Sequence, residues 1–166
     1  GKKYKPVCKE EAEKVLEIVK NNPFIVKEVK RATTSVRAYP PFTTSTLQQD
    51  ANAKLGLSSP QVMNIAQHLY EGLETPEGHL ALVTYIRTDS TRVSVDAQNK
   101  ALEYIADKYG KEYVPEKPNV YKSKKSAQDA HEAIRPIDLS KTPEQVKKLL
   151  DKNHYSVYKL MYERFI

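Results

Sequence analysis

The stretch PFTTSTLQQDANAKLGLSSPQVMNIAQHLYEG, residues 41–72, predicts two helices joined by a tight turn. Ser45 begins a Ser-x-x-Gln capping-box pattern, and Gly56 can end the first helix in a left-handed conformation. Ser59 followed by Pro60 then starts the second helix. The pattern is helix-turn-helix-like, which is common in DNA-binding modules. An ordinary pair of antiparallel helices in a helical domain fits it equally well.

The rest of the sequence adds more helices and a few strands. Apolar residues at helical spacing, with capping residues and breakers around them, predict further helices within 8–23, 94–110, 127–134, 143–150 and 154–166. β-branched and apolar runs predict strands over 24–40 and 80–88. The fold class expected is therefore mainly α with a few β-strands (α+β). An unpaired strand at 24–40 indicates that the chain was cut from a larger protein.

Composition bounds the kinds of partner that this chain can have. Its 166 residues suffice for one compact domain, or for one domain and a piece of another. A net charge of +6 favours anionic partners, with nucleic acid ahead of an acidic membrane surface. The single cysteine excludes an internal disulfide, and no Cys/His cluster has the spacing of a zinc site.

Membrane insertion and secretion are not indicated by the sequence. No window approaches 18 consecutive apolar residues, and the N-terminal GKKYKPVCKE lacks the apolar core of a secretory signal. We therefore expect a cytoplasmic location and no membrane partner.

The segment VTYIRTDSTR, residues 83–92, combines a tyrosine with arginines and hydroxyl groups. In a strand, side chains two apart share a face, so Tyr85 and Arg87 would point the same way, opposite to Thr84 and Ile86. A nearby guanidinium would stabilise a phenolate and bind a phosphate through paired hydrogen bonds. Alternatively, the segment is only a strand running into a turn, since most of the 11 tyrosines must be packing residues.

A second group of polar residues lies in SAQDAHEAIRP, residues 126–136. On a helix His131 and Arg135 stand four apart and share a face, and an imidazole beside a guanidinium suits a phosphodiester. His131 as a capping or solvent-facing residue is an equal alternative. Arg92 and Arg135 are plausible phosphate contacts in DNA binding, whereas Lys122, Lys124 and Lys125 are more typical of a solvated loop.

Three motifs in order, PFTTSTLQQDA, YIRTDSTRVS and AQDAHEAIRP, closely resemble those of bacterial DNA topoisomerase I, a type IA topoisomerase. The resemblance covers nearly the whole chain. It implies that Tyr85 is the nucleophile, that Arg87 contacts DNA at the cleavage site, and that His131 interacts with the scissile phosphate. The sequence shows no departure from the family at these positions.

The resemblance also implies a mechanism, a cofactor and partners. Such enzymes cleave single-stranded DNA through a 5′-phosphotyrosine link and relax negative supercoils without ATP. Their Mg²⁺ is bound by a toprim domain, whose acidic D-x-D motif this sequence lacks, so no metal residue is assigned here. We expect 1–42 to be part of the arch domain and 43–166 the tyrosine-bearing domain. The chain alone should be inactive in relaxation, with the toprim and arch domains as partners in the bacterial nucleoid.

Two other functions fit parts of the sequence. A non-catalytic, basic nucleic-acid-binding module would use the helix-turn-helix-like segment and the basic loops. A different tyrosine phosphotransferase, such as a replication initiator or a recombinase, would need a metal-binding histidine pair or a wider set of arginines and histidines, neither of which we can place. If the first alternative holds, Tyr85→Phe leaves every activity unchanged.

Overall fold

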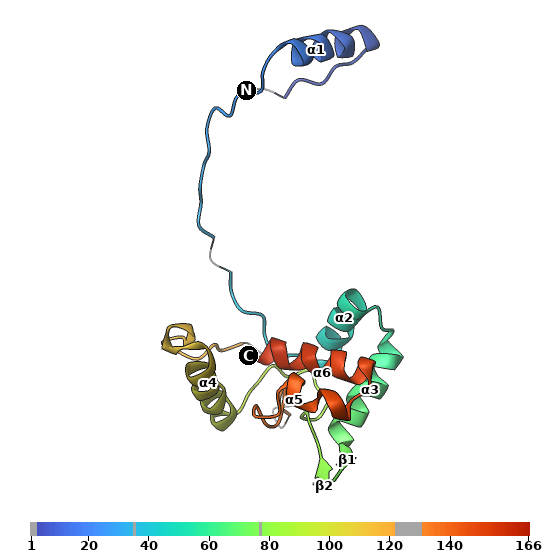
Figure 1. Ribbon diagram of the computed structural model, residues 1–166, viewed down its shortest axis with the longest axis vertical. Helices are drawn as coiled ribbons and strands as arrows, with labels where there is room; N and C mark the ends of the chain where they lie inside the picture. Colours follow the sequence, from blue (N-terminus) through green and yellow to red (C-terminus); the bar gives the residue numbers. More distant parts are fainter. Residues whose placement is uncertain (1–2, 35, 77, 122–130) are drawn as a thin grey trace. The chain divides into compact units, whose positions relative to one another are not determined.

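The computed structural model describes residues 3–34, 36–76, 78–121 and 131–166 (Figure 1). It forms two compact units, Gly1–Arg37 and Ala38–Ile166. The domain boundary expected from the sequence falls at 42/43, and Phe42 is fully buried in the core of the second unit. The assignment of the units to the arch and tyrosine-bearing domains stays a prediction.

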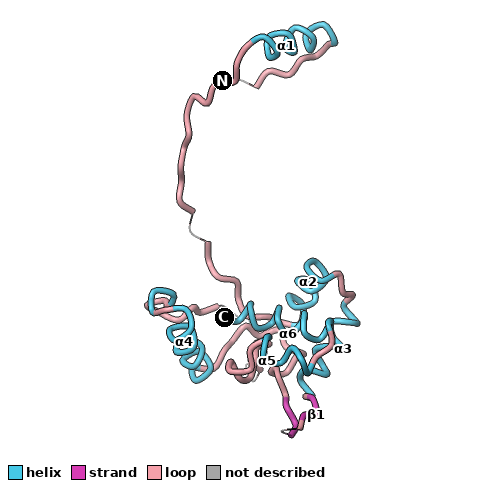
Figure 2. Tube along the Cα trace, viewed as in Figure 1, coloured by secondary structure: helices cyan, strands magenta, loops and turns pink. Residues whose placement is uncertain are grey.

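The first unit contains the expected helix but not the expected strand. Helix α1 spans Lys9–Asn21, and all its apolar side chains are at least partly exposed. The strand prediction for 24–40 is wrong, because the described residues of this segment form neither strand nor helix and run as loop (Figure 2). A strand needs a neighbour to satisfy its backbone groups, and among the described residues the one sheet pairs two other segments.

The second unit is built from helices around one core. Its helices are α2 (Thr44–Leu55), α3 (Ser59–Glu71), α4 (Val95–Tyr109), α5 (Pro143–Val146) and α6 (Lys152–Phe165), with 3₁₀ turns at Lys111–Tyr113 and Lys147–Leu149. Helix α6 packs against α2, α3 and α5. The largest fully buried side chains include Leu47 of α2, Leu69 of α3 and Tyr158 of α6. The expected α+β class with mainly helical content is confirmed.

The helix pair α2–α3 is confirmed, although its caps differ from those predicted. Gly56 ends α2 with a positive φ of 68°, which is the left-handed conformation expected of it. The helix starts earlier than the Ser45 pattern indicates, because Thr46 Oγ1 accepts a hydrogen bond from the Thr43 backbone N–H at 2.9 Å. Ser58, one residue before the expected cap, is the N-cap of α3.

A short hairpin follows α3 where the sequence shows only a turn-rich stretch. Strands β1 (Leu73–Thr75) and β2 (Gly78–Leu80) pair antiparallel. Gly72, the residue between α3 and β1, has a φ of 97°, and a Cβ there would lie 2.9 Å from the Leu80 carbonyl oxygen, so a side chain does not fit. After the hairpin, Leu82 N–H donates to the Leu69 carbonyl at 2.9 Å and returns the chain to the end of α3.

Two predicted elements around the site do not form in the residues that the structure describes. Only Leu80 of the predicted strand 80–88 lies in β2, and Val83 makes a single bridge to Pro136. In the predicted helix 127–134, residues 131–134 are not helical, while 127–130 and the cap at 126 lie outside the described residues. The Ile134 N–H donates to Phe42 O at 2.8 Å, so its backbone bonds go to another segment and not along a helix.

Within the described ranges, no helix combines the length and the apolar character that crossing a membrane requires.

Candidate active site

The segment from 85 to 90 alternates between exposed and buried side chains. Tyr85, Arg87 and Asp89 are exposed, whereas Ile86, Thr88 and Ser90 are buried. The shared face expected of Tyr85 and Arg87 is therefore present, although the segment is not a regular strand. One face anchors the segment in the core, and the other presents a phenol and a guanidinium to solvent.

Helix α2 holds this segment from one side. The hydroxyl of Thr44, the first residue of α2, donates to the Ile86 carbonyl at 2.7 Å. Thr44 N–H also donates to the Thr88 carbonyl at 2.9 Å, and Thr88 N–H returns a bond to the Thr44 hydroxyl at 2.9 Å. These bonds fix the backbone on both sides of Arg87 to the start of α2.

The 131–136 segment holds it from the other side through Thr84. Thr84 N–H donates to the Arg135 carbonyl at 2.9 Å, and Arg135 N–H donates back to the Thr84 hydroxyl at 3.0 Å. The same hydroxyl donates to the Ala133 carbonyl at 2.8 Å. These bonds draw together two segments far apart in the sequence, and they place His131 beside Tyr85.

The phenol ring of Tyr85 contacts two other aromatic rings. Its centroid is 5.4 Å from that of His131, with the planes tilted by 31°, and 5.5 Å from that of Tyr70, edge to face at 69°. The side chain of Tyr85 nevertheless remains 39% exposed. Sequence reasoning brought Tyr85 and His131 together only through the family resemblance, and it missed Tyr70, which lies in α3 with no pattern that sets it apart.

The predicted DNA contacts Arg87 and Arg92 are both exposed. Within the described part of the chain, neither guanidinium makes an ion pair, so both charges remain available to an anion. The backbone of Arg92 is fixed, because its carbonyl accepts from Ala133 N–H at 2.8 Å.

Arg135 has a different setting, since its side chain is mostly buried against Glu132. Two of its nitrogens donate to Glu132 Oε2, at 3.0 and 2.7 Å, and a third donates to the Pro136 carbonyl at 3.0 Å. Glu132 Oε1 accepts from Ser94 N–H at 2.9 Å, at the start of α4. Burial raises the pKa of Glu132, but the bonds from Arg135 and Ser94 outweigh it and leave that pKa below its ordinary value. The expected phosphate contact of Arg135 stays a prediction that competes with this ion pair.

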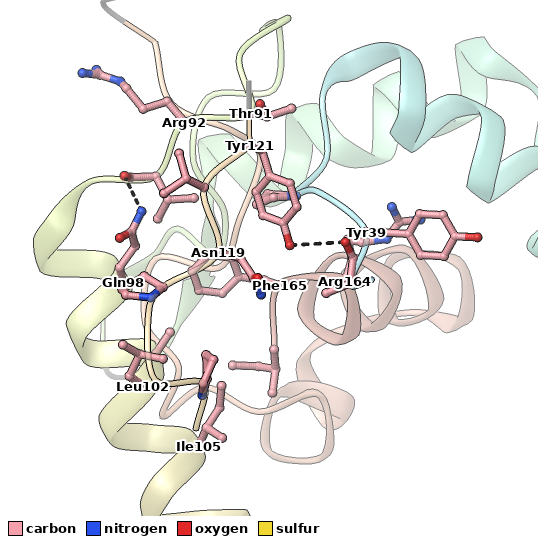
Figure 3. Close-up of a pocket in the computed structure, with 18 of the residues that line it drawn as sticks. Tyr39, Thr91, Arg92, Gln98, Leu102, Ile105, Asn119, Tyr121, Arg164 and Phe165 are labelled. Atoms are coloured by element: carbon pink, nitrogen blue, oxygen red, sulfur yellow. Dashed lines mark hydrogen bonds between the residues drawn. The ribbon is translucent and has the colours of Figure 1, made fainter. Parts of the chain in front are cut away.

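A separate cavity of about 400 Å³ lies between α4, the end of α6 and the loop before Tyr121 (Figure 3). Tyr121 donates from its hydroxyl to the Ala38 carbonyl at 3.4 Å across one side of it. Arg92 stands at its rim, but Tyr85, Arg87 and His131 do not line it. The Tyr85 phenol lies outside this cavity and is open to solvent.

No group of three His, Cys, Asp or Glu side chains in the described ranges is arranged to hold a metal ion. Residues 122–130, which contain the lysine cluster, lie outside those ranges.

The sequence matches the DNA topoisomerase family over residues 2–166. It is 48% identical to DNA topoisomerase 1 of Fervidobacterium islandicum, a match that covers 100% of this chain and 24% of the relative. It is 45% identical to DNA topoisomerase 1 of Campylobacter jejuni, over 95% of this chain and 23% of that one. The structure of full-length topoisomerase I from Thermotoga maritima superposes with a TM-score of 0.76 at 42% identity, and covers 92% of this chain and 24% of that one.

The chain therefore belongs to the DNA topoisomerase family, and the resemblance to bacterial DNA topoisomerase I that the three motifs carry is confirmed. It spans about a quarter of the length of these relatives.

Proposed function

We propose that this chain supplies the nucleophile-bearing part of a type IA DNA topoisomerase, which relaxes negatively supercoiled DNA without ATP. The observation that carries the proposal is the exposed phenol of Tyr85, held with its ring 5.4 Å from that of His131 and on the same face as Arg87. The substrate is single-stranded DNA at the cleavage site.

The reaction is a transesterification. The hydroxyl oxygen of Tyr85 bonds to a backbone phosphorus of DNA while the bond from that phosphorus to the 3′ oxygen breaks. The phenol loses its proton, the departing 3′ oxygen gains one, and the 5′ phosphate stays on Tyr85. The phosphotyrosine ester keeps the energy of the broken bond, so the reverse reaction can reseal the strand and no nucleoside triphosphate is consumed.

Arg87 and His131 stabilise the charge on the phosphate. A guanidinium binds two phosphate oxygens at once, and a protonated imidazole adds a further donor. Both groups act most strongly when water is excluded, and Tyr85 stands on an open face, so closure by another domain is part of the proposal. Arg92 extends the contact along the DNA backbone.

Mg²⁺ and the remaining domains complete the proposed enzyme. In this proposal the ion is bound by the toprim domain that the family resemblance implies. That domain and the arch are the proposed partners of this chain, and the bacterial nucleoid is its proposed place of action. By itself the 166-residue chain should give no relaxation.

A chimera tests this function. This chain replaces the matching segment of Thermotoga maritima topoisomerase I, to which it is 42% identical in the superposed structure. Relaxation of negatively supercoiled plasmid is measured with magnesium and without ATP, beside a chimera carrying Tyr85→Phe. We expect relaxation only with Tyr85. Equal relaxation by both chimeras would show that Tyr85 is not the nucleophile, and it would favour a non-catalytic DNA-binding role for this chain.

A further inference from the structure

We propose that Tyr70 is a positioning residue for the nucleophile, holding the ring of Tyr85 in the orientation that attack on the phosphate requires. This inference rests on the proposed function of Tyr85. It starts from the edge-to-face contact between the two rings, whose centroids lie 5.5 Å apart at 69°.

The orientation of the Tyr85 side chain depends on contacts with neighbouring rings, because hydrogen bonds to the described residues do not hold its hydroxyl. No hydrogen bond joins that hydroxyl to any of them. The backbone of the segment is fixed by Thr84 and Thr44, but the χ1 and χ2 rotations of an exposed tyrosine remain free unless neighbours limit them. Among the described residues, the rings of Tyr70 and His131 lie against that of Tyr85 and limit these rotations.

Tyr70 is well suited to this task, because the backbone around it is fixed by burial and hydrogen bonds. It follows Leu69, which is fully buried and whose carbonyl accepts from Leu82 N–H at 2.9 Å. The helix then ends at Glu71, and Gly72 N–H donates to the His68 carbonyl at 2.9 Å. The ring of Tyr70 is therefore carried by a rigid helix end that is bonded to the chain leading into Tyr85.

The two neighbours of Tyr85 differ in what else they can do. His131 is a candidate phosphate contact, so substituting it removes chemistry and positioning together. Tyr70 offers a purely positional test, because an edge-to-face contact needs the aromatic ring and not the hydroxyl. Tyr70→Phe keeps the ring, and Tyr70→Leu removes it while preserving an apolar helix-forming side chain. Tyr109, an exposed tyrosine at the C-terminal end of α4, gives the matched control Tyr109→Leu.

The experiment has a kinetic arm and a spectroscopic arm. In the Thermotoga chimera, cleavage of a single-stranded oligonucleotide is followed under single turnover at several DNA concentrations. Misplacing a reacting group costs up to about 10²-fold in rate, so we expect Tyr70→Leu to lower the maximal rate by about ten- to a hundredfold at unchanged half-saturation. Tyr70→Phe should restore the rate, and Tyr109→Leu should match the unsubstituted chimera. Unchanged melting temperatures separate positioning from loss of fold.

In the 166-residue chain, the NMR signals of tyrosine rings are recorded, and Tyr85 is identified by its absence in Tyr85→Phe. The Tyr85 signals should move towards those of free tyrosine in Tyr70→Leu and stay in place in Tyr70→Phe. An unchanged cleavage rate, or unmoved Tyr85 signals, in Tyr70→Leu would overturn the proposal. If the unsubstituted chimera forms no adduct at Tyr85, the proposed function fails, and the NMR signals still decide whether Tyr70 orients the ring.

Discussion

The rings of Tyr85 and His131 lie 5.4 Å apart, although they belong to segments widely separated in the sequence. Hydrogen bonds from the backbone and hydroxyl of Thr84 to the 131–136 segment create this proximity, and those of Thr44 fix the other side of the same segment. A phenol, an imidazole and the exposed Arg87 are thus presented on the surface of a helical scaffold. The fold supplies the positions, and the family membership supplies the expected chemistry.

Thr84→Val removes the hydroxyl that bonds the backbone of Ala133 and Arg135, and it leaves every side chain proposed to contact DNA unchanged. An unmade hydrogen bond at a partly buried site costs about 1–3 kcal/mol, so we expect a loss of unfolding free energy of that size. Cleavage by the chimera should also slow, because the rings of His131 and Tyr85 are no longer held at their present spacing and orientation. Denaturant unfolding and single-turnover cleavage measure the two effects. Thr33→Val, at an exposed position, is the control, and a Thr84→Val protein equal to it would contradict this role.

Glu132→Gln tests the ion pair under Arg135. Because the folded pKa of Glu132 lies below its ordinary value of 4.5, the carboxylate stabilises the fold fully above that value, and the contribution is lost as the pH falls through the folded pKa. We expect Glu132→Gln to cost about 1–3 kcal/mol at neutral pH. The difference in unfolding free energy between Glu132→Gln and the unsubstituted chain should shrink as the pH falls below 4.5, as denaturant unfolding at several pH values would measure. A constant difference at all pH values, or an equal loss in the exposed control Glu116→Gln, argues against the pair.

Arg92→Ala addresses DNA affinity. Removing one phosphate-binding cation should lower the slope of log affinity against log salt by about 0.7 for single strands, so we expect a change of that size with an oligonucleotide. Arg135→Ala is the informative comparison, since Arg135 is engaged with Glu132. Its main effect should be on stability, and an equal fall in salt slope would show that Arg135 also reaches phosphate.

Arg164→Met tests the contacts that hold α6 against the rest of the second unit. The Arg164 guanidinium pairs with Asp50 and lies over the rings of Tyr39 and Phe42, at 4.8 and 4.3 Å from their centroids. Burial raises the pKa of Asp50, but bonds from Lys54 and Arg164 bring it below its ordinary value. Removing one partner of a largely buried pair costs about 3 kcal/mol, which thermal or denaturant unfolding would detect. The control Lys159→Met removes a partly exposed lysine of α6 that pairs with Glu163, and it should change stability little; similar losses in both would refute the argument.

Local sequence signals predicted the helices but not the connections that make the site. Gly56 and the apolar spacing of α2 and α3 identified that helix pair, because caps and periodicity are properties of neighbouring residues. The 131–134 segment shows the limit of this reasoning. Its residues suit a helix, yet their backbone bonds go to Phe42 and Thr84, and such long-range pairing leaves no periodic mark in the sequence.

The same limit explains the uneven prediction of the site. The roles of Tyr85 and His131 were predicted from the family motifs, and the two-residue period of a strand predicted the face shared by Tyr85 and Arg87. Tyr70 could not be found in this way, because only the return of the chain from the β1–β2 hairpin places it beside Tyr85.

The central claim, that Tyr85 is the nucleophile, is tested most directly by mapping the covalent adduct. The chimera is mixed with magnesium and a single-stranded oligonucleotide labelled on the 3′ side of the cleavage site, then denatured and digested with protease. Mass spectrometry of the labelled peptide should show a 5′-phosphate ester on Tyr85, and the Tyr85→Phe chimera should show no adduct. An adduct on another tyrosine, or its persistence in Tyr85→Phe, would contradict the account.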